Sequence, residues 1–397
     1  MTVAIDQVKN YVEIAAELAA EFAVDIKERD KKGGVPKEQK DALRQSGLLQ
    51  LLIPKEYGGH GESWVTVSQV IRELAKVDGS IAHILGYHTF FVADFFLIAS
   101  EEQKAYYLKK TVEENLFWGN ALNPLDHSLF ATDEGDHLIL NGKKSFSSGS
   151  PDSDYLLISW EEKGDSTLYI GAIPTNRLGV TVLDDWDGIG QRQTGSGTVT
   201  FEDVIVEKSE VFPEGYSDGG LGTSAFTTLG ATISQTVLLN VFIGIAQGAL
   251  AEARQYTLTQ SKPWYTSGYE KATDDPSIQS KYGHYWIRLQ SGIGLADRAA
   301  EKFSQAWDKG LALSAEERGE TAVLVAAANV LAGEVALEIT NGIFEVMGAR
   351  SATRKNDFDR YWRDVRTHTL HNPAEYKRHT VGKWFLNGEY PAPGAYA

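Results

Sequence analysis

Histidine and tyrosine side chains at helical spacing are the first features of this sequence that could do chemistry. His83 and Tyr87 lie four residues apart in a segment with a helical pattern, so they share one face of that helix. His368 and His371 lie three residues apart near the C-terminus. Imidazole and phenol groups transfer protons or donate hydrogen bonds at a reacting centre. Each histidine alone is equally compatible with a structural role, in which its nitrogens bond to neighbouring protein groups.

A metal site is one chemistry that these histidines could support. A catalytic zinc ion needs about three convergent ligands. His83, His368 and His371 could supply them only if the fold brought the two segments together. The sequence has no His-Glu-x-x-His motif and no acidic spacing typical of metal ligands. We therefore expect no metal site.

Two segments rich in serine and glycine could bind an anion or the polar edge of a flat ring such as flavin. Ser148 lies in a Ser-Ser-Gly segment that follows Phe146, and a glycine-rich segment occupies residues 188–197. Their backbone N–H groups suit such contacts, although each segment also fits an ordinary turn. Neither a dinucleotide-binding glycine motif nor a Gly-x-Ser-x-Gly elbow occurs, which argues against Rossmann, P-loop and hydrolase chemistry.

Composition excludes several other classes of protein. The net charge of −16 disfavours binding to nucleic acid or to anionic membranes. The absence of cysteine excludes disulfides, thiolate catalysis and cysteine-ligated metals. The first 30 residues carry charges throughout, unlike a signal peptide, and apolar runs such as residues 323–332 are short for a membrane span. We expect a cytoplasmic protein.

Hydrophobic periodicity predicts three domains to position these residues. Residues 1–114 read as helices, among them 63–77 and 80–97, with Ser80 as the N-cap of the latter. Residues 115–215 alternate β-branched and aromatic residues with glycine and aspartate, which predicts a small antiparallel β-domain. Within it, Asn141-Gly142 predicts a hairpin turn. Residues 216–397 read as a helical bundle and tail, and the segment 237–250, apolar nearly all round, is expected to be buried within or between subunits.

The order of these domains, together with three motifs, resembles the acyl-CoA dehydrogenase fold. The motifs are LLQLLIPKEYGG at residues 48–59, NGKKSFSSG at 141–149 and IGQRQTGSGT at 189–198, and they fall in the family's order. The resemblance spans nearly the whole chain. It implies a mainly helical protein with an N-terminal helical domain, a central β-barrel or sandwich and a C-terminal four-helix bundle.

Two departures from that family bear on function. Dehydrogenases of this fold often carry a catalytic carboxylate in a Tyr-Glu-Gly-Thr segment, where this chain reads LHNP at residues 370–373. Abstraction of a proton from a thioester needs that carboxylate, whereas the imidazole of His371 suits hydrogen-bond donation to a flavin-bound peroxide. The family's Arg-x-x-Phe-Gly segment is replaced by YTLTQSKPW at residues 256–264. Loss of that arginine favours FMN over FAD, with Lys262 left to bind the phosphate.

A narrower resemblance, to the dibenzothiophene monooxygenases of microbial desulfurisation, accounts for these departures. It rests on DGSIAHILGYH at residues 78–88, DDWDGIG at 184–190, VMGAR at 346–350 and FDRYWRDVRTHTLH at 358–371. Such enzymes are two-component flavin monooxygenases. The resemblance implies that reduced FMN from a separate NADH:FMN oxidoreductase reacts with O₂ to a C4a-hydroperoxyflavin. That species oxidises dibenzothiophene and related aromatic heterocycles to the sulfoxide and sulfone.

The same resemblance implies roles for individual residues. Ser148 and His371 flank the reactive edge of the flavin, and His83 and Tyr87 face the substrate. Further contacts to the flavin come from Asn120, Phe146, Trp186 and Ser196. Lys262 and Arg350 hold the phosphate in a homotetramer, at least one of them from a neighbouring subunit. Lys262 falls where relatives can carry arginine, and lysine lacks the bidentate fork of arginine.

Two other readings stay open at this stage. One is an acyl-CoA dehydrogenase or a nitroalkane-oxidase-like flavoenzyme, which would hold FAD tightly. The other is a helical scaffold without catalytic activity, whose stability would not respond to flavin. Within the monooxygenase reading, sulfur heterocycles and indole-like rings suit the same flat pocket, so the sequence does not choose the physiological substrate.

Overall fold

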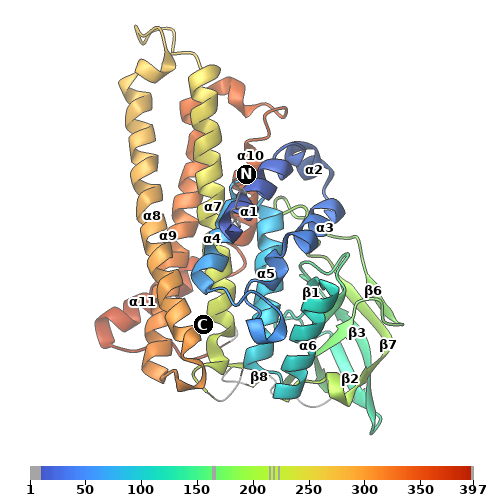
Figure 1. Ribbon diagram of the computed structural model, residues 1–397. Coiled ribbons are helices and arrows are strands. Elements are labelled where there is room, and N and C mark those ends of the chain that lie inside the picture. Colours follow the sequence, from blue (N-terminus) through green and yellow to red (C-terminus); the bar gives the residue numbers. More distant parts are fainter. Residues whose placement is uncertain (1–9, 163–166, 214–215, 218–219, 222–223, 395–397) are drawn as a thin grey trace, which may run out of the picture.

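Helices precede and follow a β-sheet in this protein, as expected (Figure 1). The computed structural model describes residues 10–162, 167–213, 216–217, 220–221 and 224–394. The change from helix to strand falls after residue 114, where the last N-terminal helix ends. We keep 1–114, 115–215 and 216–397 as the proposed domain limits.

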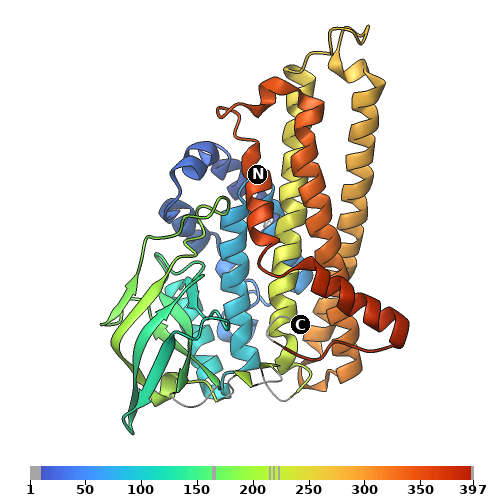
Figure 2. The ribbon, with the colours of Figure 1, turned by 180° about the vertical axis from the view of Figure 1, so that it is seen from behind.

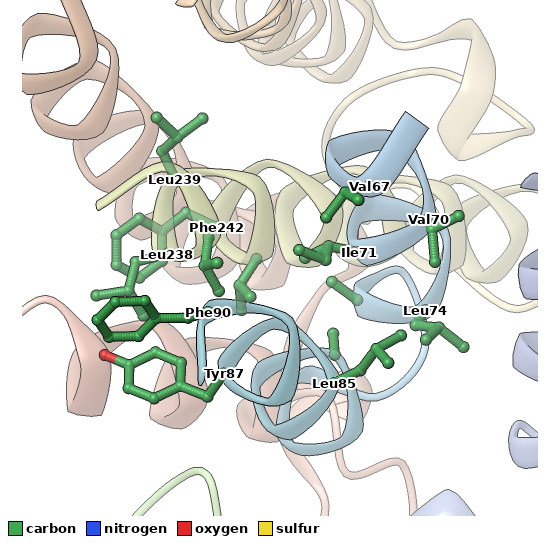
Figure 3. Close-up of a cluster of buried hydrophobic side chains, with 14 of the residues drawn as sticks. Val67, Val70, Ile71, Leu74, Leu85, Tyr87, Phe90, Leu238, Leu239 and Phe242 are labelled. Carbon is green, nitrogen blue, oxygen red and sulfur yellow. The ribbon is translucent and has the colours of Figure 1, made fainter. Parts of the chain in front are cut away.

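The helices of the N-terminal part pack around the helix at residues 79–97, which is buried. The helices are α1 (Tyr11–Phe22), α2 (Ile26–Lys32), α3 (Lys37–Ser46), α4 (Trp64–Ala75), α5 (Gly79–Leu97) and α6 (Glu101–Glu114). Every residue of α5 except Phe96 is buried. A helix that is apolar on all sides needs such cover. Figure 3 shows its side chains packed with those of α4 and α7, including Ile71, Leu85 and Phe242.

The β-domain is a curled sheet that is antiparallel in most of its pairs, but not in all of them. Its strands are β1 (Trp118–Ala121), β2 (Leu129–Asp133), β3 (His137–Lys144), β4 (Tyr155–Glu162), β5 (Leu168–Pro174), β6 (Val180–Val182), β7 (Val199–Glu207), β8 (Tyr216–Ser217) and β9 (Gly220–Leu221). The order is β6-β7-β3-β2-β4-β5-β8-β9. Strands β1 and β2 run parallel to β4, where a wholly antiparallel domain was expected.

The predicted hairpin at Asn141-Gly142 is wrong. Both residues lie inside β3, which pairs with β2 on one side and with β7 on the other, and the register shifts at this point. Gly142 has φ +134°, and a Cβ there would lie 2.0 Å from the carbonyl oxygen of Ser128. The Asn141 amide bonds Asp203 across the sheet. Pairing with a strand on each side therefore holds this dipeptide within the sheet as a bulge, although Asn-Gly locally prefers a hairpin turn.

The C-terminal part is built on three long helices with two shorter ones against them (Figure 2). They are α7 (Gly230–Thr259), α8 (Pro276–Asp308) and α9 (Ala315–Met347), followed by α10 (Asp359–His368) and α11 (Ala374–Asn387). The sequence analysis expected apolar runs that are short for a membrane span. By length and composition, however, α5, α7 and α9 are long and apolar enough to cross a membrane. Their most apolar windows are 89%, 94% and 61% buried inside the protein, so other helices already cover most of that surface.

Close contact between α4 and α7 depends on glycine, which yields a prediction for stability. A Cβ at Gly248 would lie 1.8 Å from the carbonyl oxygen of Lys76. We expect Gly248→Ala to lower the free energy of unfolding by about 1–3 kcal/mol, because the helices must separate. Denaturant unfolding measures this change. The control is Gly294→Ala in α8, where nothing lies within 4 Å and alanine should stabilise slightly. Equal stability of Gly248→Ala and wild type would contradict the prediction.

Candidate functional site

Helix α5 presents His83 and Tyr87 together, as their spacing predicts. Their ring centroids are 4.2 Å apart. The N-cap of the helix is Asp78 rather than Ser80: the Asp78 carboxylate accepts a hydrogen bond from the Ile81 amide at 3.0 Å. Ser80 instead accepts one from the backbone amide of Gln193, at 3.3 Å. The expected cap is therefore wrong by two residues, and Ser80 ties α5 to the glycine-rich loop.

The two histidine-bearing segments meet in space. His368, at the end of α10, lies with its ring centroid 4.2 Å from that of His83. Both side chains are buried, at 3% exposure for His83 and 8% for His368. Neither nitrogen of His83, nor Nδ1 of His368, has a hydrogen-bond partner within the described part of the chain. Unpaired buried polar atoms are costly, and a bound ligand that supplies the missing partner is one explanation for a cluster of them.

Desolvation lowers the pKa of all three imidazoles, of which His83 and His368 are buried side chains. Desolvation, followed by the nearby His371, lowers the pKa of His83 to about 3. Desolvation also lowers the pKa of His371 to about 4, with the charge of Lys377 as the second cause. The pKa of His368 is lowered well below its ordinary value by burial and then by the other two histidines. At neutral pH these rings are uncharged hydrogen-bonding groups. Over the described residues, no three His, Cys, Asp or Glu side chains are grouped to hold a metal ion.

The β-domain contributes a chain of hydroxyl groups from two loops. Ser148 and Ser196 are bonded through their Oγ atoms at 2.7 Å, and Thr194 continues the chain to Ser196 at 2.7 Å. Asn120 on β1 donates its amide to the Ser148 carbonyl oxygen at 2.8 Å. All of these side chains are buried. The structure thus brings together three of the site residues expected in this domain.

Lys40 on α3 supports the Ser148 loop, a role that no motif in the sequence indicated. Its Nζ donates to the carbonyl oxygens of Gly149 at 3.2 Å and Pro151 at 2.6 Å. The side chain is only 1% exposed, and burial lowers its pKa to about 7. A lysine in a charged helix normally faces solvent, so no local pattern could have identified this one.

The glycine-rich loop is fixed against the helical part of the protein rather than free. Gln191 donates its backbone amide to the Asp364 carboxylate of α10 at 2.5 Å. Trp186 donates its indole N–H to the carbonyl oxygen of Gln191 at 2.8 Å, and its ring meets that of Phe146 edge to face, 6.2 Å apart. Phe146 is 65% exposed with φ +56°. The two aromatic rings therefore offer flat faces beside the hydroxyl chain.

A cavity of about 430 Å³ lies between α7, α9 and α11, and of the three clustered histidines only His371 is among its lining residues. His371 lines it and is exposed to it. The residues that line it directly after His371 include Asn372, Pro373, Tyr376 and Lys377. His371 is therefore placed where it could contact both a ligand in this cavity and the His83–His368 pair.

Lys262 and Arg350 are not brought to this site within one chain. Ser261, next to Lys262, donates to the carbonyl oxygen of Met347 at 2.9 Å, so the α7–α8 connection contacts the end of α9 just before Arg350. Figure 1 shows this end of the bundle on the far side from the β-domain. Both cations are exposed. They occupy one corner of the molecule, separate from the hydroxyl chain.

Comparisons with known proteins agree on the family. Three family models match in order: the N-terminal domain of acyl-CoA dehydrogenase at residues 7–115, the middle domain at 120–204 and the C-terminal domain at 237–375. The chain is 44% identical to a probable FMNH₂-dependent monooxygenase, SfnC, of Pseudomonas putida, over 97% of this chain and 96% of that protein.

Two solved structures are similar over almost their whole length. Methanesulfinate monooxygenase MsuC of Pseudomonas fluorescens has a TM-score of 0.95 at 45% identity and covers 98% of this chain and 100% of its own. TdsC of Paenibacillus sp. A11-2, in complex with FMN and indole, has a TM-score of 0.92 at 41% identity, with coverage of 98% and 100%. Another structure of TdsC describes it as a dibenzothiophene monooxygenase.

Proposed function

Since the chain belongs to the acyl-CoA dehydrogenase family, in the group that holds the FMNH₂-dependent monooxygenases, we propose that it oxygenates sulfur in aromatic heterocycles with reduced FMN and O₂. The observation that carries this proposal is the cluster of neutral imidazoles where a dehydrogenase of this fold holds a carboxylate. Removal of a proton from a thioester needs a base of sufficient strength, and burial makes these imidazoles weak bases by lowering the pKa of His83 to about 3 and that of His371 to about 4. A neutral imidazole can still donate a hydrogen bond through its N–H group. The FAD-dependent dehydrogenase reading is therefore weaker.

The residues around the hydroxyl chain fit a flavin ring. Ser148 and Ser196 provide hydroxyls, Asn120 fixes the backbone of Ser148, and Trp186 and Phe146 provide flat faces. His83, whose ring nitrogens are unpaired within the described residues, lies close enough to His371 for that histidine to lower its pKa, after the larger effect of burial. When bound, reduced FMN supplies the electrons that activate O₂. Lys262 and Arg350, at least one of them from a neighbouring subunit, would hold its phosphate.

The chain's own residues orient the reactants and exclude water. His83 on α5 and His371 in the turn that follows α10 donate hydrogen bonds, and each well-placed donor is worth about 3 kcal/mol of barrier in a dry site. Tyr87 lies edge to face with Phe90 and Phe91, at centroid distances of 5.8 and 5.9 Å. Such aromatic surfaces bury a fused ring well and offer little to a charged CoA moiety.

We also propose that the protein is a cytoplasmic homotetramer. A separate NADH:FMN oxidoreductase would provide its reduced FMN. Trp286 and Ile287 on α8 are 59% and 61% exposed in the single chain. Lys262 and Arg350, proposed to hold the phosphate, are also exposed. Exposed apolar and cationic groups of this kind suit an interface between subunits.

One preparation can test both cofactor and substrate. We expect the purified protein to bind reduced FMN in preference to FAD in an anaerobic titration. On mixing with O₂ and dibenzothiophene, it should form the sulfoxide and sulfone. The same preparation should not oxidise any acyl-CoA with an artificial electron acceptor. Stoichiometric FAD that survives gel filtration, together with acyl-CoA turnover and no sulfur oxidation, would restore the dehydrogenase reading.

A second candidate function is the oxygenation of small sulfinates, the activity named for MsuC. The observation that favours it is Lys377, a buried ammonium that lines the cavity beside His371. A fused neutral heterocycle has no use for that charge.

A further inference from the structure

Helix α10 holds the glycine-rich loop by two consecutive backbone amides. Thr367 accepts a hydrogen bond from the amide of Gly190 at 3.1 Å, and the Asp364 carboxylate accepts one from Gln191 at 2.5 Å. The two backbones lie so close that a Cβ at Gly190 would be 2.1 Å from the carbonyl oxygen of Arg363. Only glycine allows this approach. The loop is therefore held against α10 at one fixed point.

This point lies one helical turn from the His83–His368 pair on both helices that carry it. Asp364 precedes His368 by four residues on α10, and Gly79 precedes His83 by four residues on α5. A Cβ at Gly79 would lie 3.0 Å from Oδ2 of Asp364, so the carboxylate packs against the first turn of α5. One turn further along, the two imidazole rings meet with centroids 4.2 Å apart. Asp364 therefore contacts the loop and both helices at once.

The loop connects this contact with the hydroxyl chain. The carbonyl oxygen of Gln191 accepts a hydrogen bond from the Thr194 hydroxyl at 2.9 Å. Thr194 is bonded to Ser196, and Ser196 to Ser148, each at 2.7 Å. The N–H of Gln191 bonds Asp364, while its carbonyl oxygen bonds the hydroxyl chain. A continuous series of hydrogen bonds thus links α10 with Ser148.

The Asp364 side chain can hold the loop in either of its protonation states. It is 7% exposed, and desolvation raises its pKa to about 7, with the hydrogen bond from Gln191 as the second, opposing cause. The ionised and the protonated carboxyl group both keep an oxygen that can accept the Gln191 N–H. A carboxamide offers the same acceptor without the cost of burying a charge, whereas a methyl group offers none. Asparagine should therefore replace Asp364, and alanine should not.

We propose that Asp364 is a positioning residue for oxygen transfer, which sets the glycine-rich loop in register with the His83–His368 pair. This inference deepens the proposed monooxygenase function and rests on it. Asp364 acts through Ser148 and Ser196, which contact the flavin in that proposal, and through its contact with α5. When the loop shifts, the hydroxyls and the imidazoles no longer face the same reacting centre, and the rate advantage of correct orientation is lost.

Comparison of Asp364→Ala with Asp364→Asn tests this role in the reaction. At saturating reduced FMN, Asp364→Ala should oxidise dibenzothiophene about ten- to a hundredfold more slowly than wild type and release H₂O₂ instead. Asp364→Asn should match wild type. The control is Asp359→Ala on the same helix, which removes an exposed carboxylate paired with Arg363 and should also match wild type. A folded Asp364→Ala with the wild-type rate, or an Asp364→Asn as slow as Asp364→Ala, would overturn the proposal.

Hydrogen exchange measured without flavin tests the contact apart from the reaction. In Asp364→Ala, the backbone amides of residues 188–197 should exchange about tenfold faster than in wild type, because the loop opens more often. In Asp364→Asn and in the Asp359→Ala control they should exchange at the wild-type rate. Unchanged exchange in Asp364→Ala would overturn the proposal even if its activity falls.

Thr367→Val decides the question if Asp364→Ala fails to fold. This change removes the bond to Gly190 and keeps the shape of the side chain. It should speed exchange of the loop and slow oxidation of dibenzothiophene, and a wild-type value of either would then overturn the proposal. If Asp364→Ala speeds exchange of the loop but the wild type oxidises no sulfur compound with reduced FMN, the contact stands and the proposed function fails.

Discussion

Replacement of His371 by alanine is expected to uncouple oxygen consumption from sulfur oxidation. The imidazole lines the cavity and lies close to His83 and His368, where its N–H can donate to the reacting oxygen. Loss of one preorganised donor slows oxygen transfer by roughly 100-fold. We expect O₂ uptake to continue and H₂O₂ to replace sulfone, while flavin affinity changes little. Parallel measurement of O₂, H₂O₂ and sulfone by electrode, dye assay and chromatography gives the coupled fraction.

The control and the pH profile sharpen this test. His137→Ala on β3 removes an imidazole that sits beside Asp136 at the surface, and it should leave coupling at the wild-type value. Desolvation, followed by the charge of Lys377, lowers the pKa of His371 to about 4, so its imidazole is neutral above that pH and gains a proton only on acidification. Coupling in the wild type should therefore not fall between about pH 8 and pH 6 through this group, although an ordinary histidine would begin to titrate there. Full sulfone yield from His371→Ala would show that the assigned role is wrong.

Arg350→Ala is expected to weaken binding of reduced FMN by roughly ten- to a hundredfold, with little effect on turnover at saturating flavin. The guanidinium is exposed at the end of α9 and makes no hydrogen bond or ion pair with other described residues of the chain, so it is available to a phosphate at a subunit interface. One charge-assisted bond to phosphate contributes about 1.5–3 kcal/mol. An anaerobic fluorescence titration measures the dissociation constant.

Arg298→Ala is the matched control for Arg350→Ala. Arg298 is an exposed arginine of α8, and its removal lowers the net charge of the protein by the same amount. Its affinity for FMN should equal that of wild type. If the two variants behave alike, the phosphate binds elsewhere, and the role expected of Lys262 at the same corner loses its support.

The sequence by itself determined where helices such as α4 and α5 form, and which residues the loops of the candidate site carry. Apolar positions at helical spacing predicted α4 and α5 nearly to their ends, because a buried helix must cover its apolar surface along its whole length. Motifs at residues 141–149 and 189–198 identified the segments that supply Ser148 and Ser196. Such motifs are local, so they can be read before the fold is known.

Some local signals were overruled by long-range partners. Asn141-Gly142 predicts a turn, yet pairing with β2 and β7 holds it inside a strand. Ser80 has the residue type of an N-cap, but Asp78 is two positions earlier and is held by Arg29 through a bond of 2.6 Å. In both cases the deciding contact comes from residues far away in the sequence, which no window of neighbouring residues contains.

The meeting of His83 with His368, and the burial of Lys40 and Lys377, were decided only by the tertiary structure. Spacing placed His83 on a helical face, but only the packing of α5, α7 and α10 brings it within 4.2 Å of a ring 285 residues later. Lys40 and Lys377 have the residue type of solvated surface groups. Their burial depends on which loops and helices cover them, and so does the charge that each carries at neutral pH. A charged side chain becomes a binding group when its surroundings remove water without supplying a counter-ion, and those surroundings exist only in the folded chain.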